Sequence, residues 1–305
     1  MTDASEATST TPYPGFRRAH AKGICVVGHF DGTPEGAALS RARVFADTGT
    51  PVLGRMSIGG GSPYGLDAQA RVRSMALVLN GADGSEWRMA MNSFPFFGAA
   101  SIETFLEQTR ASAPDPATGK PDPERMAAFA AQHPEAQRFA AWAKSAPWSD
   151  SFANTQYHSI NAFRLIDAAG AAHPVRWQLE PQTAFAALPA QVDDKQFLQH
   201  DLQQRLAQGP LRWTLRLVLA EPGDAVDDPA RPWPAERRSV DAGTLVLEQV
   251  DAPEQGACRD LNFDPLILPR GIEASADPIL AARSAAYSES FNRRSRESLS
   301  TGAKP

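Results

Sequence analysis

Residues 263–294 read FDPLILPRGIEASADPILAARSAAYSESFNRR, and this stretch near the C-terminal end decides how the rest of the chain is interpreted. Ser275 is a candidate N-cap, and Asp277 sits in the first turn, where the helix dipole favours a carboxylate. Pro278 is compatible with that turn because its missing N–H would have no partner inside the helix. The pattern therefore predicts an alanine-rich helix over 279–290.

Arg283 and Tyr287 are four residues apart, so on this helix they share one face. Arg294 lies seven residues further on, on the same side if the helix continues. The plain interpretation is a surface pair. In the alternative, the guanidinium stabilises a tyrosine phenolate, which can hold a ferric ion, and tyrosine is one of the residues that bind haem iron.

The composition sets broad limits on the function. The chain has 305 residues and a net charge of −5 without a block of basic residues, which argues against a nucleic-acid-binding surface. No apolar run approaches the length of a membrane span. Only two cysteines occur, Cys25 and Cys258, with no CxxC motif, so no disulfide framework is expected and Cys25 is interpreted as a buried thiol.

Both ends of the sequence are polar. Residues 1–14 form a Thr/Ser-rich lead without the basic start and apolar core of a secretory signal. This predicts a cytoplasmic protein, or a periplasmic one if a leader had been removed. Residues 15–294 are expected to form one domain, and residues 295–305 a tail.

The remaining pattern predicts strands first, then inserted helices, then further strands and the closing helix. This order favours an α+β fold built on an antiparallel sheet or barrel. Strands are expected at 51–58, 73–80, 87–91, 156–167, 174–180, 211–220 and 243–250, after a first one within 16–33. Helices are expected within 33–45, at 102–110, at 124–144 with a break near His133–Pro134, and at 193–207.

Several polar residues sit at the starts and ends of these strands. His20 precedes the apolar run of the first strand, with Arg17 three residues before it. A lone histidine is more often structural than catalytic, yet this one lies beside basic residues at the mouth of a strand. Arg55 and Ser57 point to one side of a later strand, because side chains alternate with period two.

The stretch Asn92–Phe97, NSFPFF, places an amide at a strand end followed by aromatic residues. Such a cluster is usually core. Phe105, eight residues beyond Phe97, lies on the helix predicted next.

Two separated stretches then point to one family. RRAHAKG at 17–23 resembles the distal-histidine motif of haem catalases, and 263–290 resembles their proximal stretch, in which arginine, three residues and tyrosine follow one another. Segments at 55–57, 73–79, 213–219 and 243–247 also resemble catalase segments. The chain is much shorter than a typical catalase and is similar to the small catalase-related peroxidases, which keep the barrel core.

The resemblance implies haem b inside an antiparallel eight-stranded β-barrel with inserted and closing helices. It assigns His20 as the distal histidine, Asn92 as the distal asparagine, Tyr287 as the axial iron ligand and Arg283 as the partner of Tyr287. The other residues that it implies are Arg17, Arg55 and Arg294 for the haem propionates, Ser57 as a hydrogen-bond partner of the histidine, and Phe97 and Phe105 at the haem face and channel.

Two departures bear on this transfer. A one-residue slip would place Met91 where the asparagine belongs, although Asn92 keeps the spacing to Phe97 and Phe105. The residues after Tyr287 lack the proline–aspartate turn of large catalases, which affects Arg294 more than Arg283.

The expected function is a haem peroxidase that reduces H₂O₂ or organic peroxides with an organic electron donor and keeps residual catalase activity. The partners are therefore small molecules, with no nucleic acid and no membrane, and a homo-oligomer is left open. The alternatives are a true catalase, an enzyme that rearranges fatty-acid hydroperoxides, and a non-enzymatic haem carrier or sensor.

Overall fold

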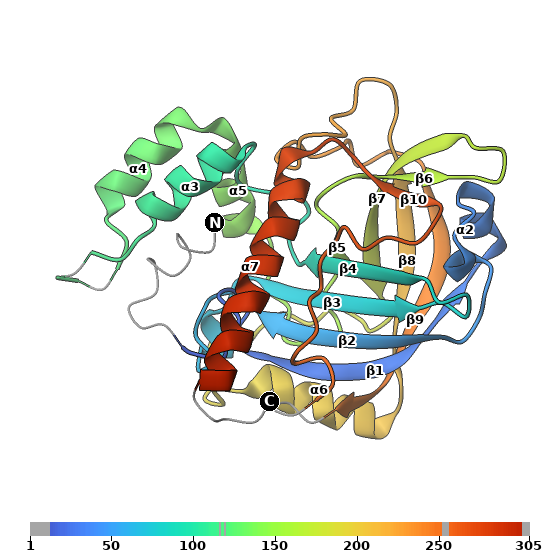
Figure 1. The fold of residues 1–305 in the computed structure, drawn as a ribbon. Coiled ribbons are helices and arrows are strands. Elements are labelled where there is room, and N and C mark those ends of the chain that lie inside the picture. The colour runs from blue at the N-terminus through green and yellow to red at the C-terminus, as the bar shows by residue number, and fades with distance from the viewer. Residues whose placement is uncertain (1–12, 116, 119, 252–255, 301–305) are drawn as a thin grey trace.

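The computed structural model describes residues 13–115, 117–118, 120–251 and 256–300, and its centre is a closed antiparallel β-barrel (Figure 1). Eight strands pair in the circular order β1-β2-β3-β4-β5-β7-β8-β9, and pairing of β9 with β1 closes the ring. These strands are β1 (Gly23–Gly32), β2 (Thr50–Ile58), β3 (Arg73–Asn80), β4 (Glu86–Asn92), β5 (Tyr157–His158), β7 (Ala172–Pro181), β8 (Leu211–Leu219) and β9 (Ser239–Asp251). The predicted fold class is confirmed.

Two short strands extend the sheet beyond the ring. Strand β6 (Phe163–Ile166) pairs with β7 across the turn at Gly170, and β10 (Ile272–Ala274) pairs with β6. The sequence predicted β5 and β6 as a single strand over 156–167. The structure breaks this segment at Ile160, whose φ of 68° is incompatible with a continuous strand.

Apolar side chains fill the inside of the barrel. Met56, Met75 and Met91 from neighbouring strands are almost fully buried there, together with Trp87 and Trp213. Because successive side chains of a strand point to opposite faces, the residues directly before and after each methionine face outward from the barrel. The interior is therefore a packed core.

The closing helix α7 (Pro278–Ser300) crosses the outer face of β2, β3 and β4 (Figure 1). Its first turn is capped by Asp277, whose Oδ1 accepts the N–H of Ile279 at 2.8 Å, while Ser275 Oγ accepts the N–H of Asp277 at 3.4 Å. The N-cap is thus Asp277 and not Ser275. The helix also continues to Ser300, so most of the predicted tail is helical; residues 1–12 of the predicted lead lie outside the described part of the chain.

The other helices match the predicted positions to within a few residues. Helices α3, α4 and α5 form a separate layer beside the barrel, with α4 and α5 divided at His133 as expected (Figure 1). The described helices are α2 (Pro34–Leu39), α3 (Ile102–Ala111), α4 (Pro123–Gln132), α5 (Pro134–Ser145) and α6 (Phe197–Gln208), with 3₁₀ turns at Arg43–Phe45 and Asp67–Gln69. Within the described residues, no helix combines the length and the apolar character needed to cross a membrane.

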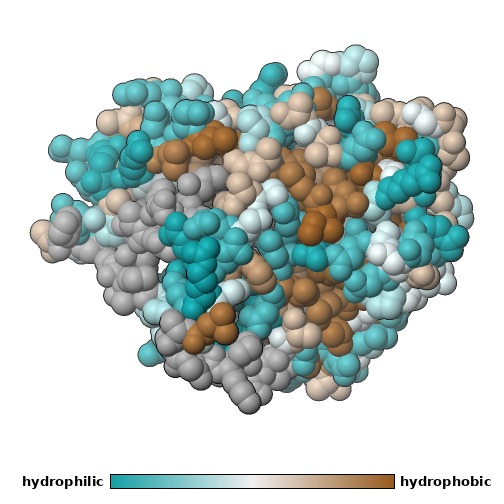
Figure 2. Space-filling model, viewed as in Figure 1, coloured by the Kyte–Doolittle hydropathy of each residue, from teal (hydrophilic) through white to brown (hydrophobic). Residues whose placement is uncertain are grey.

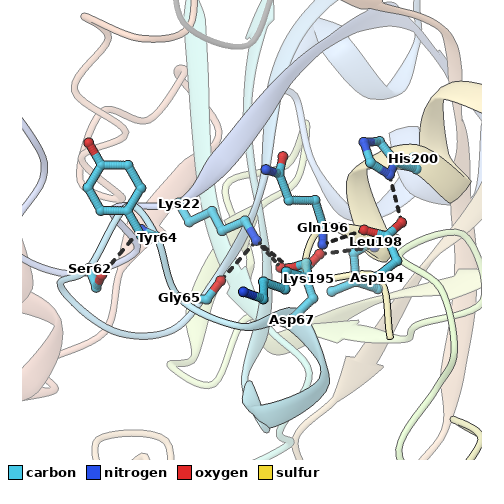
Figure 3. Close-up of polar contacts among 10 residues, drawn as sticks. All are labelled: Lys22, Ser62, Tyr64, Gly65, Asp67, Asp194, Lys195, Gln196, Leu198 and His200. Carbon is cyan, nitrogen blue, oxygen red and sulfur yellow. Dashed lines mark hydrogen bonds and ion pairs between the residues drawn. The ribbon is translucent and has the colours of Figure 1, made fainter. Parts of the chain in front are cut away.

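A buried ion pair holds the start of β1 against two distant segments (Figure 3). Lys22 Nζ lies 2.6 Å from Asp67 Oδ1 and donates to the carbonyls of Gly65 and Lys195. The second oxygen of Asp67 accepts the N–H of Leu198 at 3.0 Å, at the beginning of α6. This network fixes the chain only two residues after His20.

Candidate functional site

A cavity of about 400 Å³ lies between the outer face of β2–β4 and helix α7. Figure 2 shows hydrophobic side chains gathered beside α7 on this face of the molecule. Every residue that the sequence singled out as a site residue lines the cavity: Arg17, His20, Arg55, Ser57, Asn92, Phe97, Phe105, Arg283, Tyr287 and Arg294. The cavity is outside the barrel wall, so the expectation of a site inside the barrel was wrong, because core side chains fill that interior.

Three strands bring a serine, a serine and an asparagine into one row. The register pairs Ser57 with Ser74 and Ser74 with Asn92. Ser74 Oγ lies 3.2 Å from His20 Nδ1 and 2.5 Å from Asn92 Oδ1. The structure therefore gives the histidine contact expected of Ser57 to Ser74, while Ser57 lines the same cavity without bonding to His20.

This arrangement selects one tautomer of the histidine. Ser74 donates its only hydroxyl proton to Asn92 Oδ1, so its oxygen is left to accept a proton from His20 Nδ1. The lone pair of the neutral imidazole then sits on Nε2. The amide group of Asn92 keeps its N–H donors for another partner.

The backbone of His20 is held in an uncommon conformation. Its φ is 56°, in the left-handed region, and Arg55 donates to the carbonyls of His20 at 2.8 Å and Ala21 at 2.9 Å. Among the described non-glycine residues, only Ile160 shares a positive φ, and it also lines the cavity. Strain of this kind is typical of functional sites.

Burial makes His20 a weak base. It lowers the pKa of His20 to about 4, with the positive charges of Arg55, Arg283 and Arg17 as further causes. The imidazole is nevertheless neutral at pH 7, which is the form that accepts a proton.

Three arginines converge on one end of the cavity. Burial and mutual repulsion lower the pKa of Arg55 to about 10 and hold that of Arg17 well below its usual range, and burial lowers that of Arg294 to about 10. The negative charge of Asp260 acts in the opposite direction and raises the pKa of Arg17 and of Arg294. Within the described residues none of the three forms an ion pair, and the buried Nε of Arg294 has no hydrogen-bond partner.

Tyr287 and Arg283 lie one turn apart on α7, and both line the cavity. No hydrogen bond joins them. Arg283 instead donates to Asn161 Oδ1 and, at 2.8 Å, to the carbonyl of Ala90. Asn161 donates in turn to Asp277 Oδ2 at 2.6 Å, so Arg283 is held by a buried chain of polar side chains.

An aromatic wall completes the cavity. Phe97 stacks on Phe105 of α3 with ring centroids 5.7 Å apart, and Phe94 packs against Phe97. The helical layer thus contributes Phe105 to the site.

Sequence reasoning missed Ser74 and Asn161. Ser74 stands in the quoted segment 73–79, and pairing that strand with 51–58 and 87–91 would have placed it between Ser57 and Asn92. Asn161 follows the break at Ile160, for which the sequence carries no comparable signal.

The residues present fit haem. Uncompensated buried guanidinium groups need an anionic partner, and the unpartnered Nε of Arg294 supplies a free donor for a carboxylate. Tyr287 would bind the iron through its phenolic oxygen, whereas the groups around His20 are neutral. The apolar walls suit a flat hydrophobic ring.

Known proteins resemble this chain over almost its whole length. The catalase family model matches residues 15–299. A catalase-related peroxidase of Synechococcus elongatus is 38% identical over 92% of this chain and 84% of its own, and one of Mycolicibacterium paratuberculosis is 33% identical over 92% and 90%. The structure of a fungal catalase superposes with a TM-score of 0.82 at 21% identity and covers 94% of this chain, which spans 61% of that catalase. The chain therefore belongs to the catalase family.

Proposed function

We propose that this protein is a haem peroxidase that reduces H₂O₂ or organic hydroperoxides with electrons from a small organic donor. The observation that carries the proposal is the bonded group His20–Ser74–Asn92, which shares one cavity with Tyr287 and with three arginines that form no ion pair within the described residues. A carrier would need the tyrosine and the arginines. It would not need a neutral base with a fixed tautomer.

The arginines and the tyrosine would bind different parts of the haem. Arg17, Arg55 and Arg294 would hold the propionates, and Tyr287 would hold the iron. Haem b, when bound, supplies the two electrons that reduce the peroxide and later recovers them from the donor. The protein supplies ligand, orientation and proton transfer.

Proton transfer is the task of His20. Its Nε2 accepts a proton from one peroxide oxygen and returns it to the other, so that water leaves as the O–O bond breaks. Asn92 donates an amide N–H to the peroxide without acting as a competing base. Ser74 keeps Nδ1 protonated throughout, which holds Nε2 ready as the acceptor.

A peroxidase is favoured over a true catalase by the two relatives of similar length, both named catalase-related peroxidases. Residual catalase activity is expected, because a second peroxide can replace the donor.

The test is an absorption spectrum of the protein with haemin before and after H₂O₂, with oxygen evolution and donor oxidation recorded together. We expect donor oxidation to exceed oxygen evolution at matched peroxide. Tyr287→Phe should change the Soret band and loosen the haem, whereas the matched control Tyr64→Phe, at an exposed tyrosine, should change neither. Bound haem that is inert to peroxide would favour the carrier or sensor.

A further inference from the structure

The two cysteines of this chain form a disulfide, contrary to the expected buried thiol. The bond joins Cys25 in β1 to Cys258 across 233 residues of sequence, with the Cα atoms 5.5 Å apart. Both cysteines are almost fully buried. No local sequence pattern marks this pairing, because the two residues meet only when the segment 256–264 folds back over the barrel.

The segment 256–264 forms part of the cavity wall and orients its arginines. Arg17 donates to the carbonyls of Cys258 at 3.1 Å and Leu261 at 2.8 Å, and Arg294 donates to Leu261 at 3.0 Å. The side chains of Leu261 and Phe263 face the cavity. Any shift of this segment therefore moves two of the three arginines.

The disulfide also supports the tyrosine. Cys25 and Cys258 pack with Val78 and Phe263 in a small apolar cluster on the outer face of the barrel, and Tyr287 packs against this cluster. The bond thus anchors the segment whose carbonyls accept from Arg17 and Arg294, and it belongs to the cluster against which Tyr287 packs.

Electrostatic repulsion among the cavity arginines favours separation of the segments that form this wall. Arg17, Arg55 and Arg294 repel one another across the cavity, and they form no ion pair within the described residues. Hydrogen bonds to carbonyls of 256–264 keep Arg17 and Arg294 in place only while that segment stays in place. A covalent link to β1 resists the separation that repulsion favours.

We propose that Cys25–Cys258 is a redox site that clamps this wall, so that retention of the cavity's ligand depends on the oxidation state of the pair. Reduction by a dithiol or a phosphine adds two electrons and two protons, breaks the S–S bond and leaves two thiols. The segment 256–264 is then held to the barrel only by hydrogen bonds and by the apolar packing of Cys258 and Phe263. Insofar as the ligand is haem, the inference rests on the proposed function.

The first test compares the parent with Cys25→Ala/Cys258→Ala, in the presence and absence of a phosphine reductant. The rate of haem loss is measured from the transfer of haem to excess apomyoglobin. We expect release at least about tenfold faster from the double variant and from the reduced parent. The chain contains no third cysteine, so the reductant should have no effect on the double variant.

The second test needs no haem. Hydrogen–deuterium exchange of the ligand-free protein should rise in peptides covering 256–264 when the bond is absent and stay unchanged in α4 and α5, which serve as internal control. If the double variant fails to fold, the reduced parent carries this test. Failure of the parent to bind haemin would overturn the proposed function and leave the exchange result to decide on the clamp.

Three results would overturn the clamp. The first is two alkylatable thiols in the purified, unreduced parent. The second is unchanged haem release from a variant that folds. The third is exchange in 256–264 that is the same with and without the bond.

Discussion

Ser74 Oγ lies 3.2 Å from Nδ1 of His20, and the same oxygen donates its proton to Asn92. One hydroxyl on a central strand therefore orients both groups that would meet the peroxide. It also forces the imidazole to keep its proton on Nδ1, which leaves Nε2 as the proton acceptor.

Ser74→Ala should slow the peroxide step while leaving haem binding intact. Without the serine oxygen, Nδ1 loses its acceptor and the imidazole can change tautomer or rotate. We expect a loss of about tenfold in the rate constant, or about 1.4 kcal/mol, measured by stopped-flow from the Soret change.

Ser57→Ala is the matched control for that variant. Ser57 faces Ser74 across the β2–β3 pair and lines the same cavity, but makes no bond to His20. Its rate constant should stay within a factor of about two of the parent's. The reverse order of effects would return the role to Ser57.

The pH dependence of the peroxide step follows from the low pKa of His20. Burial, its largest cause, persists when haem is bound, although propionates would offset the arginine charges. The base is lost only as pH falls through the folded pKa, so the rate should be constant from about pH 6 upward and fall to about half its plateau value near pH 4. Stopped-flow rates between pH 4 and 8 check this, and a decline centred near the ordinary histidine value of about 6.5 would contradict it.

The sequence predicted much of the fold from local patterns, and the resemblance to catalases pointed to residues that all line the cavity. The alternation of each strand, the break at His133 and the Arg283–Tyr287 spacing each involve residues that are close together in the sequence. The side of the barrel wall on which the cavity lies cannot be predicted from such local patterns. It depends on which parity of each strand faces the core, and hence on the register of β2, β3 and β4 together.

The remaining features depend on contacts between distant segments. The Cys25–Cys258 bond and the Asn161–Asp277 contact join residues 233 and 116 positions apart, and no local pattern marks either partner. The disulfide also bears on the expected cytoplasmic location, because such bonds persist mainly in oxidising compartments. It favours the periplasmic alternative.

Arg294→Met should have opposite effects on the ligand-free and haem-bound protein. A charge-assisted hydrogen bond contributes about 1.5–3 kcal/mol, so haem affinity should fall by roughly tenfold or more. The ligand-free protein should unfold at the same or a higher temperature, because one of three repelling, buried cations is removed.

Arg212→Met provides the control for this substitution, since Arg212 is an exposed arginine on β8. Haemin titration and thermal unfolding of both variants complete the comparison. A large fall in the ligand-free melting temperature of Arg294→Met alone would mean that Arg294 mainly supports the fold.

Asn161→Asp tests the buried chain that holds Arg283. Asn161 now donates to Asp277 at 2.6 Å, and an aspartate there would place two carboxylates in contact. Burial already raises the pKa of Asp277, and a second carboxylate would raise it further, because like charges disfavour ionisation.

The sign of the pH effect follows from that raised pKa. The folded variant binds a proton that the unfolded chain releases near pH 4, so its stability relative to the parent is retained at low pH and lost as pH rises through the folded pKa. Thermal unfolding at several pH values should show a deficit that grows towards neutral pH. Asn154→Asp, in which the native amide likewise donates to an aspartate (Asp150, 2.7 Å) away from the cavity, should also destabilise the fold. Only Asn161→Asp should also speed haem release, by about tenfold, because Asn161 and the Arg283 that it holds line the cavity, whereas Asn154 does not; equal release from both variants would show that the chain through Asn161 serves the fold alone.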